Sequence, residues 1–464
     1  MQFHYLTIMD LADLLRGKEV SPVEVTEAML VRIEAMDGNL NSYATIMAEQ
    51  ALSEAGTAEE EIVAGRYRGP LHGIPIAVKD LCYTKGIRTM GGAAVLKDHI
   101  PDHDATVVTK LRQAGAVILG KLNLTEGAMG GYNPAFAVPI NPWAAEHWAG
   151  ASSSGSGVAT AAGLCFASLG SDTGGSIRFP AACNGVVGLK PTYGRVSRYG
   201  VLPLAETLDH IGPLTRCSRD AAIMMQAIAG EDAADPTSLT APVPDMLEGI
   251  ESGIAGLRIG FDHSYASEGV EGSTFTAVAN ALQLFEKMGA QIIDVEMPRA
   301  DPIAWRSMAG AEAALAHSEW FPARADEYGP FFRQVLENGH KVTGLDYAEG
   351  LQKRERYSSQ LRRVFDEVDV IGCPTMSDTA HVAPPEKMYG SLEEVMSLSQ
   401  RNIFLFTAGF DFSGSPTISL PCGFSPNGLP YSIQFAGKHL SEPLLCRIGH
   451  CYERETEWHQ RHPL

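Results

Sequence analysis

The chain has 464 residues, of which 45% are hydrophobic and 20% charged, and these values are typical of a globular protein without a disordered tract. Its formal net charge of −19 argues against binding to nucleic acid or to an anionic membrane surface, because no basic patch offsets the acidic residues. The eight cysteines show no framework spacing, and the N-terminal sequence lacks the features of a secretory signal. We therefore expect reduced thiols and a cytoplasmic location.

Apolar periodicity and turn residues predict helices that alternate with strands along the chain. An early helix follows a capping-box pattern of Ser21 and Glu24, and a later helix is expected to be capped by Asp104. Strands are expected over 71–78, 116–119, 257–261, 291–295, 368–372, 417–420 and 432–435. This alternation favours an α/β fold with a largely buried sheet.

The chain shows no internal repeat and no second independent core. We expect a single domain over residues 1–464, with its chemistry concentrated in about 70–215 and a mobile, helical, variable region in about 300–400. The longest mildly apolar run, 158–169, is too short to cross a bilayer, so no membrane association is expected.

The densest chemical signal lies between Gly150 and Ala182, where seven serines and seven glycines surround two turns, SSSGSG and SDTGGS. Glycines allow backbone N–H groups to approach a reacting atom that a Cβ would obstruct. Upstream, Lys79 ends the apolar run HGIPIAVKD, which predicts a buried strand. Serines on glycine-rich turns together with a buried lysine indicate a hydrolase with a serine nucleophile.

This composite pattern resembles the amidase signature family. The downstream motifs GVVGLKPTYGRVSRYG and LDHIGPLTR are similar to the same family, and the resemblance runs from about residue 6 to residue 463, weakest between about 230 and 400. It implies a single mixed central sheet covered by helices on both faces. It also implies an amidohydrolase that acts on linear amides through an acyl-enzyme.

The resemblance also assigns catalytic roles by the spacing of the matched residues. Ser176 matches the nucleophile, Ser152 the bridging serine that follows a cis peptide bond, and Lys79 the terminal base. From its local sequence alone, a serine after two glycines is usually only a turn residue. Ser153 and Ser154 remain alternative bridging serines. Lysine can act as a base only when neutral, and burial lowers its pKa.

The second turn also offers backbone donors for a tetrahedral intermediate. Four consecutive N–H groups form the expected oxyanion hole, those of Thr173, Gly174, Gly175 and Ser176. Asp172 and Arg178 flank this turn, and we expect them to brace it through charge-assisted hydrogen bonds rather than to contact substrate.

Three further residues are assigned to the substrate site. Met129 and Gly130 match a position that lines the acyl pocket in the family, although ordinary core packing explains them almost equally well. Ser153 is assigned to the same site as a substrate-binding residue.

We expect no cofactor and no metal. The segment GSGVAT lacks the third glycine of a dinucleotide-binding motif, and no P-loop is present. The C-terminal region contains a superficial zinc set of Cys446, His450, Cys451, His459 and His462. Residues 441–461 are expected to form one helix, and one helix cannot wrap those side chains around a tetrahedral ion.

The leading hypothesis is an enzyme that hydrolyses a small carboxamide. Its partner is then a small-molecule amide substrate with an aryl or apolar group, and esters or carbamates are further candidate substrates. A homodimer is one alternative for the oligomeric state.

The first alternative function is that of the glutamine-hydrolysing A subunit of a tRNA-dependent amidotransferase. The segment GLKPTYGRVSRYG resembles this subunit, whereas the segment GFDFSGSP departs from it. The second alternative is a non-catalytic ligand-binding member of the fold, against which the intact Lys79, Ser152 and Ser176 argue.

Overall fold

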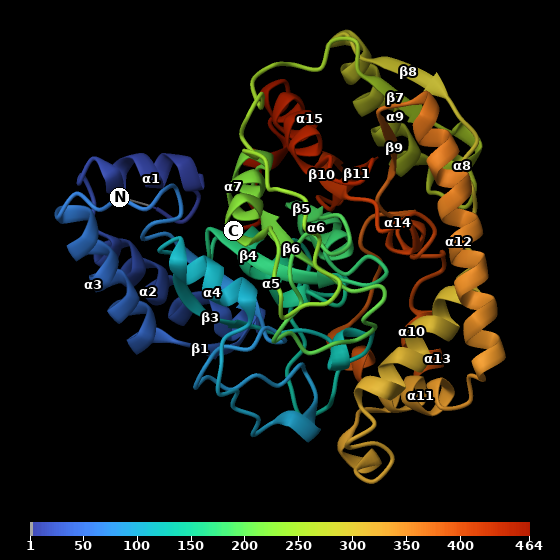
Figure 1. Cartoon of the computed structure of the whole chain (residues 1–464), viewed down its shortest axis with the longest axis horizontal. Helices are drawn as coiled ribbons and strands as arrows, with labels where there is room; N and C mark the ends of the chain where they lie inside the picture. The colour runs from blue at the N-terminus through green and yellow to red at the C-terminus, as the bar shows by residue number, and fades with distance from the viewer. Residues whose placement is uncertain (1–2) are drawn as a thin grey trace.

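The computed structural model describes residues 3–464, which form an α/β structure around one mixed sheet of eleven strands. Helices cover both faces of this sheet, as the family resemblance implied. Figure 1 shows the N-terminal helices α1 (Ile8–Arg16), α2 (Pro22–Leu40) and α3 (Ala48–Val63) at one side of the molecule. The helices α10 (Pro302–Ala316), α11 (Pro330–Gly339) and α12 (Gly344–Glu367) lie at the opposite side. The helices of the variable region therefore form one flank of the structure, whereas its strand over residues 370–374 lies within the sheet.

The strands follow the order β1-β3-β2-β4-β6-β5-β10-β11-β9-β7-β8 across the sheet. Their bounds are β1 Tyr43–Ile46, β2 Pro75–Lys79, β3 Val117–Leu122, β4 Ala167–Asp172, β5 Val187–Lys190, β6 His210–Thr215, β7 Arg258–Phe261, β8 Gln291–Asp294, β9 Val370–Pro374, β10 Thr417–Phe424 and β11 Pro430–Gly437. The strand β2 runs parallel to β3 and β4, and β7 runs parallel to β8 and β9. The remaining neighbours are antiparallel.

Fifteen α-helices surround the sheet within the described residues. They are α1 Ile8–Arg16, α2 Pro22–Leu40, α3 Ala48–Val63, α4 Thr106–Gln113, α5 Ser154–Ala161, α6 Arg178–Asn184, α7 Ser218–Ile228, α8 His263–Ser267, α9 Gly272–Lys287, α10 Pro302–Ala316, α11 Pro330–Gly339, α12 Gly344–Glu367, α13 Leu392–Ser397, α14 Ala408–Ser413 and α15 Glu442–Arg454. No helix in residues 3–464 is long and apolar enough to cross a membrane.

Two parallel neighbours within the sheet, β2 and β4, position the chemistry. In β2 and β4, Ala77 pairs with Ser168 and Val78 pairs with Leu169, and every residue of both strands is buried. This register, continued by one residue, puts Lys79 at the end of β2 level with Gly170, so that Ser171 and Asp172 end β4 just beyond it at the same edge of the sheet. That edge is where the glycine-rich turn after Asp172 begins.

Several local expectations were wrong. The side chain of Ser21 caps α2 through the Val23 N–H, but the reciprocal bond of a capping box with Glu24 is not formed. The N-cap of α4 is Ala105, and Asp104 instead accepts a hydrogen bond from the Lys85 N–H at 2.7 Å. The C-terminal helix ends at residue 454 rather than 461, and a separate 3₁₀ turn covers Trp458–Gln460.

Candidate active site

Lys79 lies at the end of β2 with a fully buried side chain. Its Nζ donates to three hydroxyl oxygens: Ser152 Oγ at 2.6 Å, Ser153 Oγ at 2.8 Å and Ser171 Oγ at 2.8 Å. Burial lowers the pKa of Lys79 to about 7, because desolvation penalises the ammonium form. The site therefore provides a lysine that can be neutral near neutral pH.

Of the three consecutive serines 152–154, two contact Lys79 and the third does not. Ser152 follows a cis peptide bond, Ala151–Ser152, at the position where the family resemblance implied one. Ser154 begins α5 and accepts a hydrogen bond from the Tyr132 hydroxyl at 2.6 Å, and the hydroxyls that Lys79 contacts do not include it. The candidates for a bridging serine are thereby reduced to Ser152 and Ser153.

Ser153 uses its whole hydrogen-bonding capacity inside the protein. Its hydroxyl donates to the Ser171 carbonyl at 3.1 Å and accepts from the Ser171 N–H at 3.2 Å as well as from Lys79. One donor and two acceptor positions are all that a serine hydroxyl has. This arrangement argues against the expected contact between Ser153 and substrate.

The hydroxyl of Ser171 is a third partner of Lys79 that the sequence analysis did not identify. Ser171 is in β4, and it lines a cavity of about 240 Å³. Other residues that line this cavity include Leu81, Ala128, Arg198, Asp209 and Ile211. A polar residue near the end of a buried strand is the only sequence signal that could have indicated Ser171.

Asp172 organises the turn that follows β4. Its carboxylate accepts hydrogen bonds from the Gly175 N–H at 2.6 Å and the Ile177 N–H at 3.0 Å. The Arg178 guanidinium donates to both carboxylate oxygens, at 3.0 and 2.9 Å. Burial opposes ionisation, but Arg178 holds the pKa of Asp172 well below its usual range. Both side chains are therefore tied to the turn by charge-assisted hydrogen bonds.

The contact with Asp172 engages one of the four N–H groups assigned to an oxyanion hole. The Gly175 N–H points at a carboxylate oxygen, so it is not directed toward a reacting carbonyl in this structure. The N–H groups of Gly174 and Ser176 have no hydrogen-bond partner within residues 3–464. Ser176 itself is buried, with 8% of the residue exposed.

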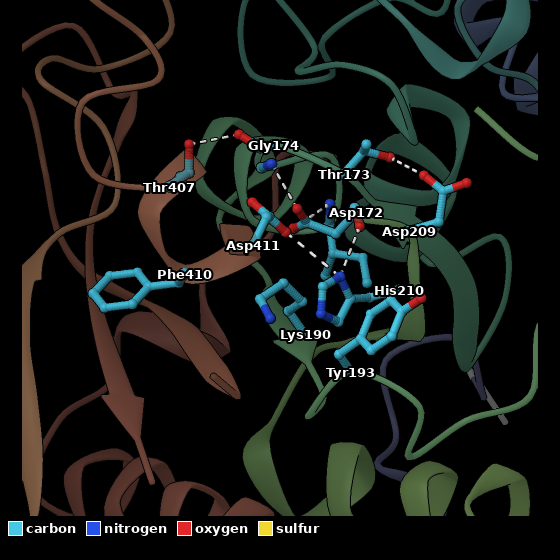
Figure 2. A network of polar contacts seen from close by, with 12 residues as sticks. Asp172, Thr173, Gly174, Lys190, Tyr193, Asp209, His210, Thr407, Phe410 and Asp411 are labelled. Atoms are coloured by element: carbon cyan, nitrogen blue, oxygen red, sulfur yellow. Dashed lines mark hydrogen bonds and ion pairs between the residues drawn. The ribbon is translucent and has the colours of Figure 1, made fainter. Parts of the chain in front are cut away.

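A second carboxylate, Asp411 of α14, shares the same guanidinium. Arg178 Nη2 donates to Asp411 Oδ2 at 2.7 Å, and the His210 ring lies 3.6 Å from Asp411 Oδ1. Figure 2 shows Asp411, Asp172 and His210 gathered at the start of the turn. Burial lowers the pKa of His210 well below its usual value, which favours the neutral ring. Asp411 lies 233 residues from Arg178, and local sequence gave no signal for this pairing.

Met129 and Gly130 lie beside the variable region. A Cβ at Gly130 would be 2.3 Å from Phe331 Cζ of α11, so this glycine is needed for close packing against the ring. Met129 is partly buried against the hydrophobic core. These contacts are the ones expected if Met129 and Gly130 serve only in core packing. A role of these two residues in substrate binding stays a prediction.

The C-terminal histidines and cysteines are dispersed. His450 lies 3.0 Å from Glu251 Oε1, whereas Cys446 is buried in the hydrophobic core. Across the described residues 3–464, no group of three or more His, Cys, Asp or Glu side chains could hold a metal ion.

A family model described as Amidase matches residues 24–446. The chain belongs to the amidase signature family. This amidase is 44% identical to amidase AmiD of Mycobacterium tuberculosis over 99% of its own length and 96% of the relative. It is also 39% identical to the A subunit of a glutamyl-tRNA(Gln) amidotransferase from Geobacter sp., with 99% of each chain covered.

Solved structures agree with this assignment. The native peptide amidase from Stenotrophomonas maltophilia superposes with a TM-score of 0.84 at 30% identity, covering 98% of each chain. A bacterial aryl acylamidase of the same family superposes with a TM-score of 0.88 at 23% identity and supports the fold alone. The contacts of Lys79 with Ser152 and Ser153 are consistent with the Ser-Ser-Lys arrangement of this hydrolase family.

Proposed function

We propose that this amidase hydrolyses the C–N bond of a small carboxamide through an acyl-enzyme on Ser176. The observation that carries the proposal is the buried Lys79 Nζ at 2.6 Å from Ser152 Oγ. A neutral lysine can accept a proton from a hydroxyl, and a bridging hydroxyl can pass on the proton of a second serine. The backbone N–H of Ser153 donates to the Ser176 carbonyl at 3.4 Å, which places these two serine segments in contact.

In the proposed acylation, Ser176 Oγ attacks the substrate carbonyl carbon while its proton passes to Ser152. The proton of Ser152 passes to Lys79 at the same time. The N–H groups of Thr173, Gly174 and Ser176 stabilise the negative oxygen of the tetrahedral intermediate, a contribution of about 3–4 kcal/mol for each well-placed donor. The protonated Lys79 then returns a proton through Ser152 to the departing nitrogen, and the C–N bond breaks.

Deacylation follows the same route in reverse. A water molecule loses a proton to the Ser152–Lys79 relay and attacks the ester carbonyl carbon of the acyl-enzyme. Collapse of this second intermediate returns the proton to Ser176 and releases the carboxylic acid. Because the oxyanion hole contacts only the carbonyl oxygen, we propose that esters and carbamates are also turned over.

For the substrate, we propose a small aryl or apolar group next to the amide. The aromatic side chains of the variable region support this choice, because Phe331 of α11 packs directly against Gly130, which matches an acyl-pocket position in the family. Purified protein should be assayed with aryl amides, anilides, carbamates, short aliphatic amides and glutamine. Preference for short polar amides over every aryl amide would contradict the proposed substrate class.

The role of Ser176 is tested by labelling. An arylsulfonyl fluoride should add one adduct to the wild-type protein, detected by intact-mass spectrometry, and none to Ser176→Ala. The variant should also lose turnover while keeping the melting temperature of the wild type within a few degrees. Equal labelling of the variant would assign the nucleophile to another residue.

The identity of 39% to amidotransferase A subunits favours one second candidate function, glutamine hydrolysis within a larger assembly. The segment GFDFSGSP weighs against it, because this segment departs from the corresponding sequence of that branch of the family. We propose that the purified chain alone hydrolyses an aryl amide or carbamate faster than glutamine. Activity that appears only after partner subunits and tRNA are added would favour the second candidate.

A further inference from the structure

Three consecutive backbone carbonyls in the turn before Ser176 each accept a hydrogen bond. The pairs are Trp305 Nε1 to Thr173 O at 3.0 Å, Thr407 Oγ1 to Gly174 O at 2.6 Å, and the Phe179 N–H to Gly175 O at 2.7 Å. The first two donors come from α10 and from the residue before α14, more than 130 residues away in sequence. Figure 2 shows the contact between Thr407 and Gly174.

These contacts fix the directions of the N–H groups that follow the carbonyls. The peptide bonds of this turn are trans, and in a planar trans peptide the C=O and the next N–H point in opposite directions. Trp305 therefore fixes the direction of the Gly174 N–H. Thr407 fixes that of the Gly175 N–H, which points at Asp172 as the geometry requires.

We propose that Trp305 is a positioning residue for the oxyanion hole, and that Thr407 holds the next peptide plane of the same turn. They hold two peptide planes so that the Gly174 N–H stays free and directed away from Trp305, while the Gly175 N–H stays on Asp172. This inference rests on the proposed acylation of Ser176. Preorganised donors stabilise a transition state because they need no rearrangement at the moment of reaction.

The packing around Trp305 supports a fixed geometry. Its side chain is 5% exposed, and its ring centroid lies 4.9 Å from that of Phe404. A Cβ at position 174 would lie 2.5 Å from Trp305 Cζ2, so Gly174 allows the indole to contact the turn directly. Because α10 belongs to the variable region, the segment expected to shape the substrate site also orients a catalytic N–H group.

The first test replaces Trp305 with phenylalanine, which removes the indole donor and keeps an aromatic ring. We expect kcat for an aryl amide to fall about 10- to 100-fold, with KM changed less than about threefold, because the lost interaction acts in the transition state. The rate of Ser176 modification by an arylsulfonyl fluoride should fall by a similar factor. This second readout does not require a known substrate.

Trp143→Phe is the matched control. The Trp143 indole donates to the Asn184 carbonyl at 2.8 Å, at the far end of α6 from the nucleophile turn. Its loss should lower the melting temperature about as much as Trp305→Phe does. It should leave kcat and the labelling rate within about twofold of the wild type.

A second pair of variants, at Thr407, tests the peptide plane between Gly174 and Gly175. This pair remains informative if Trp305→Phe fails to fold. Thr407→Val removes the hydroxyl at nearly constant volume and should lower kcat and the labelling rate at least about fivefold. Thr407→Ser keeps the hydroxyl and should restore both rates to within about twofold of the wild type. If the Thr407 methyl group mattered only for packing, the serine variant would be no better than the valine variant.

The outcomes of these tests separate this inference from the proposed function. If the wild-type protein is active and labelled at Ser176, but Trp305→Phe and Thr407→Val both keep their rates within twofold, the inference alone is overturned. The inference alone is also overturned if Trp305→Phe only raises KM, or if Trp305→Phe loses no more activity than Trp143→Phe. If the wild-type protein is neither active toward any amide nor labelled at Ser176, the proposed function fails and the inference falls with it.

Discussion

The proton state of Lys79 is the property on which the proposed mechanism depends most. Burial lowers its pKa from 10.5 to about 7. This difference of about 3.5 corresponds to a free-energy penalty of about 5 kcal/mol on the ammonium form in the folded protein. At pH 8 a lysine with a pKa of 7 is about 90% neutral, whereas an ordinary lysine is less than about 1% neutral. We predict that kcat/KM rises with pH through one ionisation near 7 and reaches a plateau above about pH 8.

Replacing the lysine separates its chemical role from its structural role. Lys79→Met removes the base and should lower kcat/KM at pH 8 by at least about 1000-fold. Lys79→Arg should do no better, since arginine keeps its proton at that pH. The assay is hydrolysis of an aryl amide across pH 5–10. A Lys79→Arg variant that keeps a rate near that of the wild type would show that this lysine serves as a structural cation.

The same pKa predicts a stability effect. The pKa in the folded state is lower than in the unfolded chain, so between about pH 7 and 10.5 the unfolded chain binds more protons and stability rises with pH. From pH 7.5 to 9.5, the free energy of unfolding of the wild type should gain about 2–3 kcal/mol relative to Lys79→Met, as measured by urea denaturation. A difference that does not change with pH would refute the lowered pKa.

Three further predictions concern the neighbours of Lys79 and the rest of the site. Ser152→Ala should slow acylation about 100- to 10,000-fold, whereas Ser153→Ala should slow it less than about tenfold; the reverse order in stopped-flow acylation rates would make Ser153 the bridge. Asp411→Ala removes one of two carboxylates on the buried Arg178, so the free energy of unfolding should fall by about 3 kcal/mol in urea titrations, while an effect below about 1 kcal/mol would show that Asp172 suffices. Prolonged treatment with a chelator should leave the hydrolysis rate unchanged, and activity lost to the chelator and restored by one metal ion would contradict the proposed metal-independent relay.

The sequence by itself determined the features that depend on neighbouring residues. The apolar run before Lys79 required a buried strand, and desolvation in such a strand lowers the pKa of a lysine. The glycines of SDTGGS required a tight turn, and Gly175 adopts a φ of +133°, a conformation that residues with a Cβ rarely adopt. Because the motif is long and continuous, the family was also evident before the structure.

The tertiary structure decided which strands form the centre of the sheet. The strands β4, β5 and β6 were not expected, because they are buried on both faces and show no alternation of polar and apolar residues. In β6, Pro213 pairs opposite Leu169, although proline usually argues against an interior strand. Yet β4 brings Ser171 and Asp172 beside Lys79, and β6 carries His210 to the turn.

Only the tertiary structure could identify the partners that hold the turn. Asp411, Thr407 and Trp305 lie more than 130 residues from the groups they contact, and nothing in their local sequence marks them as donors or acceptors for that turn. A hydrogen bond or ion pair needs only two side chains brought within about 3 Å, and the chain path that brings them together is set by packing of the whole sheet. The local sequence therefore specifies the reacting groups, and the global fold specifies their orientation.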